Sequence, residues 1–373
     1  MYNELYNLLS LPKSKILQKF PTFNLKIHEN VILFGAAQLG TIYIRLCKKN
    51  KINVSAICDN DRNKINGRIE GIQIISVEDL KKFPKDISII ITSQHDEAIY
   101  KQLISLGYSN IWNHMYFSTF FPYKFSNIYW SNSFTLLKKH KTELFACMNI
   151  LADKYSQKTL LNIIKFRIFL DRSYLKQIVN SNKDEYFDEK IIPLKNESEV
   201  FIDGGAYNGD TILKFIQKSN NKFKNIYAFE PDIESFNLLK KNINQSNDPR
   251  IKIYRMALDS KKNTLGFTND GTPGSRITRS SNTTIQTTDL DTFLRNDKPT
   301  IIKLDVESYE KNALLGCKNI ISNYHPKLAI SIYHKTSHLW KIPLLIKNLY
   351  PGYKLYLRHY TTDLYDTICY AVE

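Results

Sequence analysis

A short apolar run, Val200 to Ile202, leads directly into an acidic, glycine-rich turn and then into a helical pattern. The turn begins with Asp203-Gly204-Gly205 and ends with Gly209-Asp210. Glycine permits positive φ and lets a ligand approach the backbone closely. In open α/β sheets, a strand-turn-helix unit of this kind binds ligands at the carboxyl edge of the strands. We therefore expect the second half of the chain to form a parallel sheet with a ligand slot at that edge.

Apolar runs alternate with helical patterns in two long stretches of the chain. In the first stretch the expected strands are Val31 to Phe34, Val54 to Cys58 and Ile87 to Ile91. In the second they are Val200 to Ile202, Ile226 to Phe229, Ile251 to Met256, Thr300 to Leu304 and Leu328 to Tyr333. Such alternation predicts parallel sheets with helices on both faces. The expected fold class is α/β, with two doubly wound, Rossmann-like domains.

Changes in this pattern suggest the domain boundaries. We expect a Rossmann-like N-terminal domain over residues 1–115, a helical connector over residues 116–186 and a second doubly wound domain over residues 187–373. Two late apolar runs, Tyr353 to His359 and Ile368 to Val372, are joined by a polar turn. They predict an antiparallel pair at the edge of the second sheet.

Composition excludes several classes of protein. The 373 residues are 43% hydrophobic and 24% charged, as in soluble globular proteins, and no stretch approaches the ~18–20 apolar residues of a membrane span. The five cysteines are dispersed without a C-x-x-C pair, which argues against disulfides and a structural metal. The charge of +16 comes from dispersed lysines, so nucleic acid is not the expected partner. We expect a cytoplasmic protein. The sequence leaves its oligomeric state open, and a homo-oligomer is among the states that it allows.

Charge distinguishes between the ligands that such a turn can hold. Asp203 and Asp210 would repel the pyrophosphate of a dinucleotide, but they suit the sulfonium cation of S-adenosylmethionine. Glu230 ends the next strand roughly twenty residues beyond Gly209, where a carboxylate accepts hydrogen bonds from ribose hydroxyls. We therefore predict S-adenosylmethionine as the cofactor. The residues expected to bind it are Asp203, Gly204, Gly205, Gly209, Asp210, Glu230, Pro231, Ala257 and Asp305.

Acidic residues also end the fourth expected strand of the second half, which lies beside the first strand in a doubly wound sheet. Methyl transfer to a hydroxyl needs a group that removes its proton, and a carboxylate or a neutral histidine suffices. The catalytic candidates are Asp305, Glu307 and His334, with His338 and His359 of lower weight. In the alternative interpretation, Glu307 caps the following helix and Glu310 pairs with Lys311 or solvent; a structural role of this kind fits Glu310 better than Asp305.

The order of these motifs resembles the FkbM-type methyltransferases, which methylate hydroxyls of sugars and of glycosylated natural products. The resemblance covers about residues 186–373. It rests on Asp203-Gly-Gly-Ala, Phe229-Glu230-Pro231, Lys303-Leu-Asp305-Val-Glu307 and the strand Leu328 to Tyr333 followed by His334. It implies a class I methyltransferase fold and a transferase that methylates a sugar hydroxyl in the biosynthesis of a surface polysaccharide or similar glycan. The acceptor would be a saccharide or a nucleotide sugar.

One position departs from the family, which commonly has Gly where this chain has Ser308. We expect its Cβ to narrow the acceptor side of the site slightly. The resemblance also makes Ser275 and Arg276 candidates for substrate binding, in a Gly- and Ser-rich polar stretch that is otherwise an ordinary surface loop.

The N-terminal stretch Val31 to Gly40 reads as a dinucleotide fingerprint in which Ala37 replaces the middle glycine. Because that methyl lies where a pyrophosphate comes closest, tight binding of NAD is doubtful. Gly35, Gly40 and Asp59 are the expected residues of an N-terminal nucleotide site. The domain resembles nucleotide-sugar-binding modules fused to sugar-modifying enzymes, which implies recognition of substrate; a structural or dimerising role is the other interpretation. The alternative function is a nucleotide-sugar-binding protein or sugar oxidoreductase working through this domain.

Overall fold

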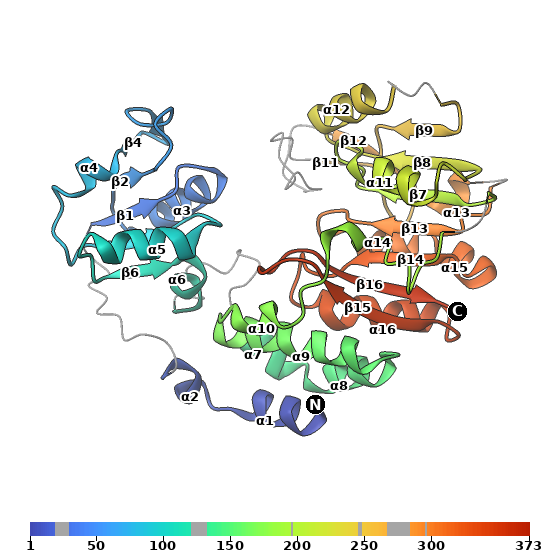
Figure 1. Ribbon diagram of the computed structural model, residues 1–373, viewed down its shortest axis with the longest axis horizontal. Helices are drawn as coiled ribbons and strands as arrows, with labels where there is room; N and C mark the ends of the chain where they lie inside the picture. The colour runs from blue at the N-terminus through green and yellow to red at the C-terminus, as the bar shows by residue number, and fades with distance from the viewer. Residues whose placement is uncertain (19–29, 121–132, 195–196, 245–247, 267–283, 295–296) are drawn as a thin grey trace. The chain divides into compact units, whose positions relative to one another are not determined.

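The computed structural model describes residues 1–18, 30–120, 133–194, 197–244, 248–266, 284–294 and 297–373 (Figure 1). The chain divides into two compact units. The C-terminal unit contains Met1–Ser10 and Phe134–Glu373, and the N-terminal unit contains Leu11–Ser133. None of the helices in the described residues combines the length and apolar character needed to cross a membrane.

The N-terminal unit is built on a six-stranded sheet in the order β3-β4-β2-β1-β5-β6. All neighbouring strands are parallel except β3 and β4. The strands are β1 Val31–Phe34, β2 Val54–Cys58, β3 Arg68–Ile69, β4 Ile72–Ile75, β5 Ser88–Ile91 and β6 Ile111–Asn113. The helices are α2 Lys13–Leu17, α3 Gln38–Lys49, α4 Val77–Leu80, α5 Asp96–Ser105 and α6 His114–Phe120. The three strands expected from the sequence are all present.

The C-terminal unit contains a seven-stranded sheet in the order β15-β16-β14-β13-β7-β8-β9, from bottom to top in Figure 1. The strands are β7 Val200–Gly204, β8 Asn225–Phe229, β9 Ile251–Tyr254, β13 Ile301–Leu304, β14 Lys327–Ser331, β15 Lys354–His359 and β16 Thr367–Val372. From β14 to β9 all pairs are parallel, whereas β16 is antiparallel to both β14 and β15. The predicted antiparallel edge is therefore confirmed, and so is the pairing of the fourth expected strand with the first.

A small second sheet was not expected from the sequence. It has the order β10-β12-β11 and lies in the same unit. Its strands are β10 Ala257–Leu258, β11 Asn263–Gly266 and β12 Thr284–Thr288. β10 has only two residues, and β11 and β12 are largely polar, with exposed side chains on alternate positions of β12, so these strands carry little of the apolar signal that marks a strand in sequence.

Helices cover both faces of the large sheet. Side chains of α11 Asp210–Lys218 and α12 Ile233–Asn244 pack against one face, in a core with Phe201, Ile226 and Ile301. Because side chains alternate along a strand, Ile202 and Ile302 point to the opposite face. The remaining helices of this part are α13 Leu290–Phe293, α14 Glu310–Leu315, α15 Lys318–Tyr324 and α16 His338–Leu349.

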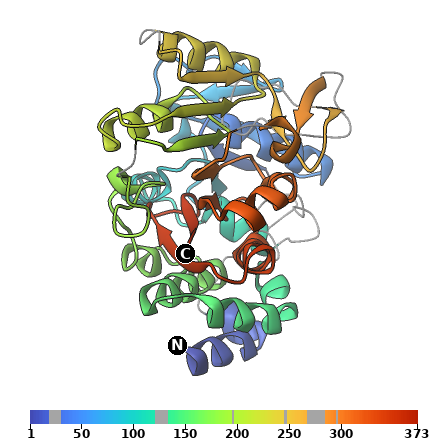
Figure 2. The ribbon, with the colours of Figure 1, turned by 90° about the vertical axis from the view of Figure 1, so that its right-hand side faces the viewer.

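The expected connector does not form a separate layer. Its helices after residue 133 belong to the C-terminal unit: α7 Ser133–Lys139 from its second residue on, α8 Lys141–Ile150, α9 Lys154–Phe169 and α10 Ser173–Lys176. Helix α8 packs on α16, and α9 packs against the edge strand β15. A 3-10 turn at Asn182–Asp184 then leads toward β7. Both views show α1 Tyr2–Ser10 beside these helices (Figure 2), where Glu4 forms an ion pair with Lys165.

Candidate active site

A cavity of about 290 Å³ opens at the carboxyl edge of the large sheet. Its wall comes from the loops that follow β7, β8, β9 and β13, together with Tyr333 after β14 and Asp366 before β16. Seven of the residues predicted from the sequence line it: Gly205, Asp210, Glu230, Pro231, Ala257, Asp305 and Glu307. The size is at the low end of the ~300–1,000 Å³ of small-molecule sites.

Glycine is required where the loop after β7 passes over the loop after β13. Gly205 has φ +77°, and a Cβ on it would lie 1.8 Å from the carbonyl oxygen of Asp305. No side chain fits in that space, and a left-handed φ favours glycine in any case. The close approach of the two loops therefore needs the second glycine of the motif, as the sequence suggested.

Glu230 is held rigidly and still has acceptor capacity. Its Oε2 accepts the backbone N–H of Tyr207 at 2.8 Å, and its Oε1 accepts that of Asp232 at 2.8 Å. Each carboxylate oxygen has a second lone pair, which is available to a ligand hydroxyl. Burial raises the pKa of Glu230 to about 7, against the effect of these two hydrogen bonds. The predicted ribose clamp thus lies in the cavity wall with the required acceptors.

Asp203 lies behind the cavity wall and not in it. Its side chain is fully buried, and its Oδ1 is 2.9 Å from Nζ of Lys303, which also donates to the carbonyl oxygen of Gly205 at 2.6 Å. Carboxylates outweigh burial and raise the pKa of Lys303, so it remains an ammonium ion. We expected Asp203 to contact a ligand directly. Its side chain has a structural role instead, because the ammonium group of Lys303 neutralises it.

The cavity is nevertheless strongly acidic. The acidic side chains that line it are Glu185, Asp210, Glu230, Asp232, Asp305, Glu307 and Asp366, against two lysines, Lys214 and Lys303. Burial and the neighbouring acids Glu185 and Asp305 raise the pKa of Asp366 to about 7. Such crowding destabilises the ionised carboxylates and is relieved by a bound cation. From Asp203 and Asp210 we expected the site to favour a cationic ligand over a pyrophosphate. The same argument applies here, but it rests on a larger set of acids that line the cavity.

Asp305 collects several donors at the end of β13. Its Oδ2 accepts the hydroxyl of Tyr186 at 2.8 Å, and its two oxygens lie 3.1 and 3.2 Å from the hydroxyl of Tyr333. Its Oδ1 is 3.3 Å from Nε2 of His334. Most of its lone pairs are therefore occupied by donors from the protein.

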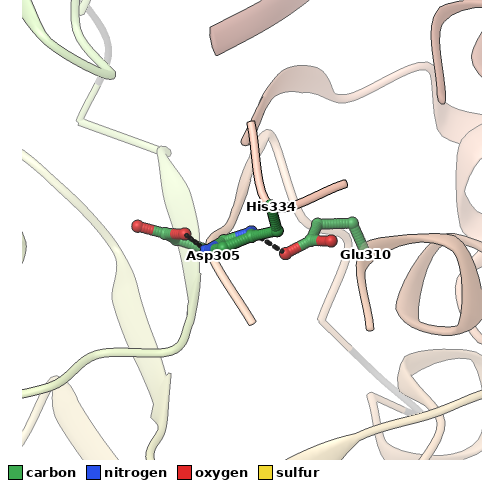
Figure 3. A group of neighbouring side chains, drawn as sticks. All are labelled: Asp305, Glu310 and His334. Carbon is green, nitrogen blue, oxygen red and sulfur yellow. Dashed lines mark ion pairs between the residues drawn. The ribbon is translucent and has the colours of Figure 1, made fainter. Parts of the chain in front are cut away.

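His334 lies between Asp305 and Glu310 (Figure 3), and its side chain is 4% exposed. Its Nε2 is 3.5 Å from Oε1 of Glu307, and its Nδ1 is 2.8 Å from Oε1 of Glu310. Oε2 of Glu310 lies 3.1 Å from Nδ1 of His338. Glu310 is fully buried, so the interpretation that it pairs with Lys311 or solvent is wrong. It follows Asp305 by five residues and turns inward at the first residue of α14.

The group Asp305, Glu310 and His334 has the residue types of a metal site, but not the geometry. Figure 3 shows the imidazole between the two carboxylates, with one ring nitrogen facing each of them. A single ion has to be reached by all its ligands at about 2 Å, and the ring occupies that central position. Oε1 of Glu310 also accepts the backbone N–H groups of Val306 and Ser308. The arrangement fits a chain of charged hydrogen-bonding groups.

Ser308 affects the loop through its backbone. Its φ is +82° and that of Glu307 is +48°, both in the left-handed region. The glycine usual at this position in the resembling family suits that conformation, whereas a Cβ strains it. Ser308 does not line the cavity, so the expected narrowing of the acceptor side is not seen.

The other predicted residues have structural positions or lie outside the described residues. Gly204 is the last residue of β7, and Gly209, with φ +88°, precedes α11. Ser275 and Arg276 lie outside the described residues.

Several wall residues were missed, among them Glu185, Tyr186, Lys303 and Asp366. Lys303 begins one of the motifs that carry the family resemblance and is a lysine inside an otherwise apolar strand, but it was not assigned to the site. The others come from segments with no motif.

In the N-terminal unit the predicted residues also meet at one sheet edge. Gly35 has φ +126°, and a Cβ on Gly40 would lie 2.2 Å from the carbonyl oxygen of Gly35. Oδ2 of Asp59 accepts the backbone N–H of Ala36 at 2.6 Å, and Oδ1 accepts that of Asp61 at 2.8 Å. Asp59 thus anchors the loop after β1 much as Glu230 anchors the loop after β7.

Comparison with family models gives two matches. Residues 203–362 match the model described as "Methyltransferase FkbM domain", and residues 27–111 match the one described as "C2185-like, N-terminal". The first match shows that residues 203–362 are similar to FkbM methyltransferase domains. The second names no nucleotide or sugar, so the expected nucleotide-sugar-binding domain stays a prediction. No curated protein matches the chain.

Among solved structures, Methyltransferase FkbM from Methylobacillus flagellatus KT matches with a TM-score of 0.75 and 21% identity, over 98% of this chain and 94% of that chain. This similarity shows that the two chains share a fold. An rRNA methylase from Streptococcus thermophilus has 11% identity and a TM-score of 0.31, over 48% of this chain and 89% of that one. Aeropyrum pernix fibrillarin, in complex with natively bound S-adenosyl-L-methionine, has 12% identity and a TM-score of 0.31, over 48% and 69%. Similarities at that TM-score say nothing further about the chain.

Proposed function

We propose that the C-terminal unit is an S-adenosylmethionine-dependent O-methyltransferase that acts on a sugar hydroxyl in glycan biosynthesis. The observation that carries the proposal is the cavity at the carboxyl edge of the sheet, where acids outnumber lysines and Glu230 has free acceptor lone pairs. A sulfonium nucleoside satisfies both features. A dinucleotide also has ribose hydroxyls for Glu230, but the acids would repel its pyrophosphate.

The wall residues divide into two groups by position. Gly205, Asp210, Glu230 and Pro231 follow β7 and β8 and would hold the donor, with Ala257 beside them. When bound, the donor supplies an electrophilic methyl group on a positively charged sulfur.

Carboxylates and tyrosine hydroxyls line the acceptor end of the cavity. Glu185, Tyr186, Glu307, Tyr333 and Asp366 line that side, and all of them can hydrogen-bond to hydroxyl groups. A polyhydroxylated acceptor such as a saccharide fits this lining better than an apolar one. An acidic saccharide would be repelled, so we propose a neutral sugar as the group that is methylated.

Calorimetric titration of the full-length chain with S-adenosylhomocysteine tests the donor site. We expect binding by the wild type and at least about a hundredfold weaker binding by Glu230→Ala, which loses the ribose acceptor and leaves two backbone N–H groups without a partner. Glu234→Ala, on the first turn of α12 and outside the cavity wall, is the matched control and should bind as the wild type does. Equal affinity in wild type and Glu230→Ala would refute the assignment of this cavity as the donor site.

A second candidate function, recognition of a nucleotide-linked sugar by the N-terminal unit, is favoured by the anchoring of the Ala36 N–H by Asp59. This resembles the arrangement around Glu230, although Ala37 still stands in the place of a glycine. Thermal denaturation with NAD or with a nucleotide sugar tests it, since a ligand stabilises the unit that binds it. No shift with either compound would exclude this function.

A further inference from the structure

One set of buried ionisable groups in the described part of the structure lies next to the cavity carboxylates but does not line the cavity. It comprises Glu310 at the start of α14, His338 at the start of α16, and His334 in the loop between β14 and α16. All three are at most 5% exposed. Burying ionisable side chains costs free energy unless they form hydrogen bonds or ion pairs with one another, so their arrangement needs an explanation.

His334 is not placed to reach a substrate. It does not line the cavity, and the carboxylates of Asp305 and Glu307, which do, lie 3.3 and 3.5 Å from its Nε2. The other ring nitrogen faces Glu310 at 2.8 Å (Figure 3). Both ring nitrogens therefore face carboxylates, a setting that favours a proton on each of them.

Charges around the ring support the same conclusion. Burial alone would lower the pKa of His334, but Glu310, Glu307 and Asp305 outweigh it, and the pKa lies well above the ordinary value. The cations nearby are Lys335, which donates to the carbonyl oxygen of Ser308, and Arg167 of α9, which donates to that of Tyr333. Burial lowers the pKa of His338, so this second imidazole is neutral.

Glu310 also joins the two loops that carry the site. Its Oε1 accepts the backbone N–H groups of Val306 and Ser308, at 3.1 and 3.3 Å, in the loop that presents Asp305 and Glu307. Through both oxygens it contacts His334 and His338, from the loop after β14 and the helix that follows. The Glu310 carboxylate thus fixes the position of the His334 imidazole relative to the loop that carries Asp305 and Glu307.

We propose that Glu310 and His338 are positioning residues that hold His334 as an imidazolium behind Asp305 and Glu307, so that a cavity carboxylate and not His334 takes the acceptor's proton. The proposal rests on the proposed methyl transfer. Asp305 already accepts from two tyrosines, whereas among the described residues His334 alone faces Glu307 as a donor. Glu307 is therefore the carboxylate left to act as the base.

The step balances without any further reactant. The acceptor oxygen bonds to the methyl carbon as its proton passes to Glu307, and the carbon–sulfur bond breaks with its electron pair kept by sulfur. The imidazolium stabilises the paired carboxylates before the transfer. Glu307, with a side chain 26% exposed, then releases the proton to solvent.

The protonation state of His334 is measurable without knowing the acceptor. Full-length protein with 15N-labelled histidine rings is titrated by NMR, and the His334 signals are identified by their loss in His334→Gln. We expect both ring nitrogens of His334 to stay protonated at pH 8. In Glu310→Gln we expect the midpoint to fall by at least about one pH unit, because one of three facing carboxylates is gone. A neutral His334 at pH 7 in the wild type would overturn the proposal.

Two further variants separate positioning from simple destabilisation. Glu199→Gln changes an equally buried glutamate at the opposite end of β7, bonded to Thr300 and Lys327, and should leave the His334 midpoint unchanged. His338→Gln keeps a neutral side chain near Glu310. It should shift the midpoint of the His334 titration by less than Glu310→Gln does. If Glu310→Gln does not fold, His338→Gln is measured in its place. Equal shifts in Glu199→Gln and Glu310→Gln would contradict the positioning role.

Binding of S-adenosylhomocysteine is measured on the same samples. Glu310→Gln should bind it within about threefold of the wild type, because Glu310 does not line the cavity. If the wild type does not bind the ligand, the proposed function fails while the state of His334 is still determined. If binding is normal and His334 is neutral, the inference alone fails.

Discussion

Glu307 faces the cavity with fewer protein donors than Asp305, and burial raises its pKa, as suits a general base near neutral pH. We expect Glu307→Gln to lower the rate of methyl transfer by about 10²- to 10⁴-fold, the usual contribution of such a group. Transfer of labelled methyl from S-adenosylmethionine to a mixture of neutral methyl glycosides measures it. Affinity for S-adenosylhomocysteine should change little.

Glu189→Gln is the control for this variant, because Glu189 is exposed and its nearest cation is Lys218 at 3.7 Å. It should transfer methyl groups as fast as the wild type. If Glu307→Gln keeps full activity while Asp305→Asn loses it, Asp305 is the base and the division of roles between the two carboxylates is wrong.

Glu230 gives donor binding a pH dependence whose sign follows from its pKa. The folded value of about 7 lies above the ordinary 4.5, so the folded state keeps this proton longer and the group's contribution to stability is lost as pH rises from about 5 to 7. Ligand hydroxyls donate more strongly to the ionised carboxylate than to the protonated carboxyl group, so affinity should rise with pH. We expect S-adenosylhomocysteine to bind about tenfold more weakly at pH 6 than at pH 8.

Calorimetric titration at the two pH values measures this effect. Asp366→Asn removes the other wall acid with a pKa of about 7 and should retain the dependence. A pH-independent affinity in the wild type would mean that Glu230 is ionised throughout, or that it does not contact the ligand.

Among the elements, the loop from β13 to α14 stores strain at Ser308, where φ is +82°. We expect Ser308→Gly to raise the free energy of unfolding by up to about 1 kcal/mol, since relief of the left-handed strain exceeds the added freedom of the unfolded chain. Urea denaturation measures it. Ser322→Gly, inside α15, places glycine in a helix and removes a hydroxyl that donates to the carbonyl oxygens of Lys318 and Leu349, so it should lower the free energy by about 1–2 kcal/mol. If both variants had a lower free energy of unfolding than the wild type, Ser308 would not be strained.

Helix α9 depends on Asp153 at its start. The side chain accepts the backbone N–H of Ser156 at 2.6 Å and pairs with Arg358 of β15 at 2.9 Å. Asp153→Ala should therefore cost about 1–2 kcal/mol, mostly from the lost cap. Lys158→Ala, exposed on the same helix, should cost less than about 0.5 kcal/mol. Thermal denaturation compares the two, and equal effects would mean that the cap contributes nothing.

The elements that sequence predicted well are those with strong local signals. Strand β7 and its glycine turn, the acid after β8 and the antiparallel edge could all be found, because apolar period and glycine placement are local properties. The contacts of Glu310, His338 and Tyr186 could not be predicted, since they join loops far apart in the chain. Asp203 was assigned to the ligand because nothing in sequence showed that Lys303 of the neighbouring strand neutralises it.

At the scale of the whole molecule, the chain has a charge of +16, yet its cavity is acidic. The lysines responsible for the net charge are dispersed, so total charge says nothing about this site. The positions of the acids at the sheet edge, and not the net charge, are the basis for the cationic ligand that we propose.

Two compact units predict two thermal transitions in scanning calorimetry of the full-length chain. S-adenosylhomocysteine at a hundred times its Kd should stabilise one of them by about 2.7 kcal/mol and leave the other unchanged. Glu230→Ala, which should not bind at that concentration, is the control. Stabilisation of both transitions by the ligand would show that the units do not unfold independently.

The edge strand β15 is closed by residues that precede the matched domain. The N–H of Ala152 donates to the carbonyl oxygen of Leu355 at 2.8 Å, and Arg167 donates to the carbonyl oxygen of Tyr333 beside His334. A recombinant fragment cut at residue 203 would lack both, leaving an unpaired β-edge prone to aggregation and the loop that carries His334 without its buried cation. The shortest piece worth expressing therefore starts near Phe134, about seventy residues before the boundary that sequence similarity alone would recommend.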